Sequence, residues 1–214
     1  MSNSEWFRRG TWTDADRRDF NCRLSRCRNR ENRGQCLRIQ ALHLAQSGYH
    51  EGAIELLDRL LVEFPEKTQV AQAHAQKADS LAKLGHTEGA ISEYRRALQS
   101  ERDFPNVRTN AWLDFGWFVV EKQLTHYYDE VSEVLNEFRE ESGFTLPLAE
   151  YRYCAIQSLL ADARGNNAAA QGFAKAALAQ AALRHSGLRY HPTVGLVGTE
   201  RGKVEIRLRM LADS

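Results

Sequence analysis

The chain has 214 residues, of which 43% are hydrophobic and 27% are charged, and its formal net charge is +1. These values are typical of a soluble globular protein built as one domain, with or without appendages. The N-terminal sequence lacks the apolar core of a signal peptide, and no apolar run has the length needed to cross a bilayer. The sequence therefore predicts a cytoplasmic protein with no membrane contact.

The charges are distributed unevenly along the chain. Residues 1–40 carry a net charge of +5, residues 41–150 carry −9, and residues 151–214 carry +5. Two basic ends therefore flank an acidic middle. This pattern predicts attraction between the ends and the middle, within one molecule or between two copies.

The first segment, residues 1–32, combines an aromatic arm with a basic helix. We expect Trp6, Phe7 and Trp12 to pack onto a neighbouring helix, because aromatic side chains this large are rarely left free in solvent. Thr13 predicts a helix N-cap, and the helix should span Asp14–Arg28. Its basic side chains are Arg17, Arg18, Arg23, Arg26 and Arg28. They indicate either a nucleic-acid contact or a solvated face that pairs with the acidic middle.

The stretch Gln69–Leu98 organises the rest of the chain. It predicts two helices joined at Gly85, which can take the left-handed conformation that ends a helix. In both halves, apolar residues recur three or four positions apart and so lie on one face. The small residues Ala78 and Ala90 would let the two axes approach closely. Each helix has a single apolar stripe, so the hairpin needs a neighbour of its own kind to bury it.

Similar hairpins are predicted on both sides of this stretch. Gly48 and Gly165 stand at comparable turns, and in each case an alanine follows five residues later, as Ala90 follows Gly85. The expected helices of these neighbours are Gly34–Ser47, Glu51–Phe64, Ala111–Glu121, Tyr127–Glu141, Leu148–Ala163 and Asn167–Arg184. Between the second and fourth hairpins stands Trp112-x-x-Phe115-Gly116-x-x-Val119. The helix that contains it is apolar on nearly every side and should be buried.

This pattern resembles the tetratricopeptide repeat family, whose signature is W-x2-L-G-x2-Y, then A-x3-F, then P, at a period of about 34 residues. The resemblance covers residues 33–184, or about four repeats. It implies an all-α fold, a right-handed superhelical stack of antiparallel helix hairpins. The first helix of each pair would line a concave groove that binds a peptide or partner protein.

The resemblance also implies which side chains face that groove. We expect partner-binding roles for Arg38, Asp79, Asn110, Trp117 and Arg152. The arginines and the asparagine could donate hydrogen bonds to a carboxylate or backbone, and the tryptophan could act as an apolar anchor. Leu113 and Leu159 are assigned to the same groove. Alternatively, the N-terminal arm or the C-terminal loop of the chain itself fills it.

Residues 185–214 form the last segment. One proline and three glycines in Ser186–Thr199 predict a loop that folds back over the last repeat, followed by a short closing helix, Glu200–Leu211. Such a cap is expected because the last repeat of a stack would otherwise expose its apolar face. We expect Val204, Ile206, Leu208 and Leu211 to be available for burial.

Few residues indicate chemistry. The cysteines Cys22, Cys27 and Cys36 invite a metal interpretation, but no CxxC pair is present, and Cys27 shares a helical face with apolar residues. Tyr190-His191 in the C-terminal loop could make a small site, but a histidine in a loop is more often structural. We therefore expect no metal, no cofactor and no enzymatic activity.

The leading hypothesis is a protein–protein interaction module with a protein or peptide partner, which could be a second copy of the chain. The alternative is a nucleic-acid-binding regulator that uses the arginine-rich N-terminal helix.

Overall fold

The computed structural model describes residues 6–140, 145–198 and 202–214. The expected end of the helix Tyr127–Glu141 and the expected start of the helix Glu200–Leu211 lie outside these ranges. The helices in chain order are α1 (Asp14–Arg26), α2 (Arg30–Gln46), α3 (His50–Glu63), α4 (Lys67–Lys83), α5 (Thr87–Asp103), α6 (Ala111–Glu121), the 3₁₀ helix η1 (Thr125–Tyr127), α7 (Tyr128–Glu140), α8 (Pro147–Ala163), α9 (Asn167–Ala182) and α10 (Gly202–Ala212). The described residues contain no strand, so the all-α prediction is confirmed.

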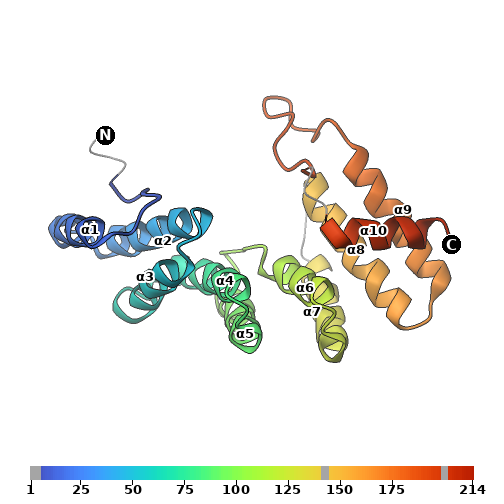
Figure 1. Cartoon of the computed structure of the whole chain (residues 1–214), viewed down its shortest axis with the longest axis horizontal. Coiled ribbons are helices and arrows are strands. Elements are labelled where there is room, and N and C mark those ends of the chain that lie inside the picture. The colour runs from blue at the N-terminus through green and yellow to red at the C-terminus, as the bar shows by residue number, and fades with distance from the viewer. Residues whose placement is uncertain (1–5, 141–144, 199–201) are drawn as a thin grey trace. The chain divides into compact units, whose positions relative to one another are not determined.

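The chain divides into two compact units, Met1–Ala111 and Trp112–Ser214. The division falls inside the predicted repeat region. In the first unit, α2 packs on α3 and α4 on α5, and α4 also contacts α3 and α2 (Figure 1). In the second unit, α8 packs on α9. Consecutive helices are therefore the main packing partners, as expected for hairpins joined by short turns.

One turn geometry recurs four times along the chain. Two positions after the last helical residue before each turn stands a residue with positive φ, namely Gly48 (85°), Gly85 (80°), Gln123 (56°) and Gly165 (71°). The next amide in each case donates to the carbonyl five residues earlier, as in Tyr49 to Leu44, His86 to Leu81, Leu124 to Val119 and Asn166 to Ala161. This is the hydrogen bond of a Schellman motif. The predicted turns at the three glycines are confirmed, and the third hairpin uses the same turn without a glycine.

The turn at Gln123 allows a matched pair of substitutions. The left-handed conformation costs a residue with a Cβ about 1–2 kcal/mol. A glycine avoids this cost, but it makes the unfolded chain more flexible, which offsets part of the gain in stability. We expect Gln123→Gly to raise the free energy of unfolding by about 0.5–1 kcal/mol. We expect Gly85→Ala to lower it by about 1 kcal/mol, although nothing lies within 4 Å of the added Cβ. Urea unfolding of both variants measures the difference, and a destabilised Gln123→Gly would contradict the assignment of this turn.

Small residues sit where the two helices of each hairpin approach. Seven residues before each turn residue stand Ala41, Ala78, Gly116 and Ser158, and all four are buried. In the last hairpin Ser158 Oγ donates to the carbonyl of Ala170 on α9 at 2.8 Å. A Cβ on Gly116 would lie 3.2 Å from Val131 of α7 and 3.0 Å from Ile156 of α8. The expected close approach at Ala78 and Ala90 is thus supported, since both are fully buried.

The N-terminal segment covers the first hairpin. Thr13 forms a capping box with Asp16 at the start of α1, as its sequence predicts. Helix α1 ends at Arg26 instead of Arg28, because Asn29 caps α2 by accepting a hydrogen bond from the amide of Asn32. Trp12 packs edge-on against Phe20 at 5.5 Å between ring centroids. The expected packing of the aromatic arm is confirmed.

Helix α10 closes the second unit. It contacts α9 and, less extensively, α8, and it lies across them in Figure 1. Val204 and Leu208 are buried as expected. Ile206 and Met210 lie on the opposite face and are 62% and 69% exposed, so the expectation for Ile206 was wrong. Ile206 and Met210 are one helical turn apart and lie on the face of α10 that does not pack on α9.

Candidate partner-binding site

Helix α6 is apolar on nearly every side, and most of it is buried. Trp112, Leu113, Phe115 and Phe118 each have less than a tenth of their surface exposed. Trp117 differs, because it keeps a partly exposed ring. An indole at the edge of an otherwise buried helix can be both a packing element and a contact surface.

Trp117 is held in a cluster with residues of α8. Its ring centroid lies 5.9 Å from that of Tyr151, with a tilt of 46°. The Cζ atom of Arg152 lies 5.6 Å from the same indole centroid, within the range of a cation–π contact. Arg152 Nη1 also donates to Asp114 Oδ1 at 2.5 Å. The first helices of the third and fourth hairpins are therefore joined by a charged and aromatic contact.

This cluster leaves polar groups in reach of solvent. The side chains of Arg152 and Asp114 are 31% and 24% exposed. A guanidinium has five N–H donors, and one contact to Asp114 leaves others for an incoming carbonyl or carboxylate. Stacking on Trp117 restricts the arginine before a ligand arrives, which reduces the entropy lost on binding. The geometry can thus bind an extended polar backbone beside an apolar side chain.

The other predicted groove residues lie elsewhere. Arg38 on α2 donates from Nε to Gln69 Oε1 on α4 at 2.7 Å, and burial lowers the pKa of its guanidinium. Asp79 on α4 accepts a hydrogen bond from the hydroxyl of Tyr94 in the same hairpin at 2.7 Å. Asn110 is exposed immediately before α6. The structure brings Trp117 and Arg152 together, while Arg38 and Asp79 belong to the other unit.

Two residues assigned to the groove are part of the core instead. Leu113 and Leu159 have at most 1% of their surface exposed. Their helices are buried on several sides, so the face chosen from sequence spacing includes core positions. They offer no surface to a partner.

The chain's own N-terminal arm occupies one face of α2. Gln40, which is fully buried, accepts from the amide of Arg9 at 3.1 Å and donates to the carbonyl of Arg9 at 2.8 Å. Arg9 in turn binds Asp16 and Asp19 of α1 through its guanidinium. A side-chain amide that satisfies both backbone groups of one residue is a strong positional constraint. Part of the first hairpin is therefore covered by the chain itself.

The described part of the C-terminal loop, residues 186–198, has local hydrogen bonds and no convergent polar site. Gly195 O accepts from the amide of Leu148 at the start of α8, at 2.7 Å, which confirms that the loop folds back on the last hairpin. Ser186 is buried and bonds within the loop to His191 and Pro192 backbone atoms. Tyr190 and the side chain of His191 are exposed.

Sequence reasoning missed an ion pair at the junction of α7 and α8. Arg139 donates to both carboxylate oxygens of Glu150, at 2.8 and 3.1 Å, and its Cζ lies 4.4 Å from the Tyr153 ring centroid. The hydrogen bond to Glu150 raises the pKa of Arg139. The two residues lie on different helices, 11 positions apart, so no helical spacing could have revealed the pair.

Within the described ranges, no three His, Cys, Asp or Glu side chains are grouped to hold a metal ion. No described helix combines the length and apolar character needed to cross a membrane. Comparison with protein-family models, with curated proteins and with solved structures finds no match for this chain. The functional argument therefore depends on the geometry of the molecule.

Proposed function

We propose that this protein is an interaction module that binds a peptide or partner protein on the face formed by α6 and α8. The observation that carries the proposal is the partly exposed Trp117 with Arg152 stacked on it and paired with Asp114. Partly buried tryptophan and arginine are the residue types that most often dominate the binding energy of protein interfaces. We further propose that the hairpins stack in the manner of tetratricopeptide repeats.

The recurring turns support this proposal. Four hairpins with the same closing hydrogen bond and small residues at the helix contact provide rigid supports for the side chains on their first helices. A preformed surface of this kind needs little ordering when a ligand binds, so more of the contact energy appears as affinity. In this scheme Trp117 anchors an apolar side chain, while Arg152 donates to a backbone carbonyl or a carboxylate.

The nucleic-acid alternative is weakened because two of the four arginines of α1 form ion pairs. Arg17 is paired with Glu55 at 2.6 Å and Arg23 with Asp19 at 3.0 Å, so both are partly neutralised. Nucleic-acid binding depends on free positive charge that can displace counterions from phosphates. We therefore place the partner-binding function on α6 and α8, and not on α1.

The test is affinity capture of partners from a native lysate with tagged protein. We expect Trp117→Ala and Arg152→Gln each to reduce recovery of a specific partner at least tenfold, as for residues that dominate an interface. The matched control is Arg164→Gln, an exposed arginine that pairs with Asp129 at 2.9 Å in the same unit. Equal recovery by the wild type, both site variants and the control would exclude this face as the binding site.

A further inference from the structure

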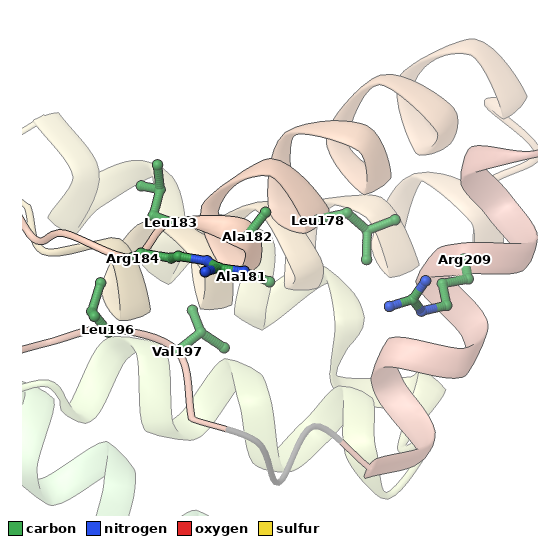
Figure 2. Close-up of a pocket in the computed structure, with 8 residues that line it drawn as sticks. All are labelled: Leu178, Ala181, Ala182, Leu183, Arg184, Leu196, Val197 and Arg209. Carbon is green, nitrogen blue, oxygen red and sulfur yellow. The ribbon is translucent and has the colours of Figure 1, made fainter. Parts of the chain in front are cut away.

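A pocket lies near the C-terminal end of the second unit, apart from the face of α6 and α8. This open pocket of about 650 Å³ is lined by the end of α9, by residues 183–184 and 196–197 of the segment that follows it, and by α10 (Figure 2). Its lining residues are Leu178, Ala181, Ala182, Leu183, Arg184, Leu196, Val197 and Arg209. It shares none of these residues with the face of α6 and α8, so it is an independent candidate. We propose that this pocket binds an aliphatic carboxylate.

The wall of the pocket selects an aliphatic group. Six of the eight lining residues are alanine, leucine or valine, and none is aromatic. Leu178 and Val197 point into the space from opposite sides in Figure 2. The volume is within the range of sites that enclose small organic ligands. An alkyl chain fills such a space, and each methylene that it buries should strengthen binding about fourfold.

The two remaining lining residues select a negative charge. Arg184 and Arg209 extend toward each other from opposite ends of the pocket in Figure 2. Arg209 is bound to Glu205 through two nitrogens, at 3.0 and 2.6 Å, so its charge is partly neutralised. Arg184 makes no hydrogen bond or ion pair to any described residue. No acidic residue belongs to the described lining.

An open pocket lined mainly by aliphatic side chains, with an unpaired guanidinium at one end, is complementary to an alkyl chain that ends in a carboxylate. A guanidinium binds a carboxylate with two parallel hydrogen bonds, which a neutral or cationic head group cannot accept in the same way. An aliphatic carboxylate of this kind can come from two sources. One is a free medium-chain fatty acid, and the other is the C-terminal leucine or valine of a peptide.

The experiment is a titration of the full-length ¹⁵N-labelled protein followed by amide chemical shifts. Octanoate should shift the amides of Ala181, Leu196 and Val197 in a saturable manner and, with two more methylenes, bind about 16-fold more tightly than hexanoate. Octylammonium and octanol test the charge preference and should bind at least tenfold more weakly than octanoate. A short peptide that ends in Val-Leu, compared with its C-terminal amide, tests the second source.

A pair of variants locates the charge recognition. We expect Arg184→Gln to weaken octanoate binding about tenfold. Arg189→Gln removes an exposed arginine that stacks on Tyr190 and is not part of the lining. This variant should therefore bind octanoate as tightly as the wild type does. Tighter binding of octanoate or of the peptide acid identifies the source. The proposal fails if neither saturates, if octylammonium or octanol binds as well as octanoate, or if Arg184→Gln has no effect.

Discussion

Glu93→Gln should lower the free energy of unfolding at pH 7 by up to about 3 kcal/mol. Glu93 is 4% exposed and binds His74 at 2.6 Å, Lys77 at 3.0 Å and Arg96 at 2.8 Å. Burial alone would raise the pKa of this carboxyl, but the hydrogen bonds from His74 and Lys77 outweigh it and lower the pKa to about 2. The substitution leaves the partly buried ammonium of Lys77 with Asp58 as its remaining carboxylate, at 2.6 Å.

The effect has a defined pH window. The folded-state pKa of about 2 lies below the ordinary value of 4.5, so the stabilisation is fully present above about pH 4.5. It is lost as the pH falls from there toward 2. Urea unfolding at pH 7, 5 and 3 should therefore show wild type and Glu93→Gln converging in acid. The control Glu51→Gln changes an exposed residue of α3 and should follow the wild type at every pH. If the free energies of unfolding of Glu93→Gln and the wild type differed by the same amount at all three pH values, this account would be contradicted.

Ala90→Leu should destabilise the protein by about 1–3 kcal/mol. Ala90 has no exposed surface and stands five residues after the turn at Gly85, where α5 meets α4. Three added carbon atoms must displace close-packed neighbours or push the two helices apart. The change should appear as a lower urea midpoint with an unchanged dependence on urea concentration.

The control for overpacking is Ala176→Leu on α9. Ala176 is exposed, so the same added carbon atoms meet solvent, and we expect a change within about 0.5 kcal/mol. If Ala90→Leu had the same urea midpoint as the wild type, the inference that α4 and α5 are in close contact at Ala90 would be wrong. A loss of stability in both variants would point to helix propensity instead of packing.

Most of the helices could be predicted because their signals are local. Gly48, Gly85 and Gly165 end helices through a conformation that glycine adopts without strain, and apolar spacing fixes the faces between them. The third turn was harder to recognise because Gln123 carries no such signal. Its left-handed conformation is rare for a residue with a Cβ, so the residue type does not indicate it.

The candidate site could be predicted only in part. Trp117 and Arg152 were singled out separately from a repeat pattern, but their contact joins residues 35 positions apart and depends on how α6 meets α8. The burial of Leu113 and Leu159 was missed because a helix covered on several sides shows no single apolar stripe. The two hydrogen bonds between Gln40 and the backbone of Arg9 also depend on tertiary packing. Glutamine and arginine are usually exposed, so the sequence gives no sign of this contact.

The proposal that a partner binds on α6 and α8 is tested most directly by photo-crosslinking. A benzoylphenylalanine in place of Glu121, an exposed position one helical turn after Trp117, would report on molecules that contact this face. The control places the same group at Glu133, an exposed position on α7. We predict a single crosslinked partner from position 121 that is absent from position 133 and is lost in the Arg152→Gln background. Crosslinks that are equal at both positions, or unaffected by Arg152→Gln, would contradict the proposed binding face.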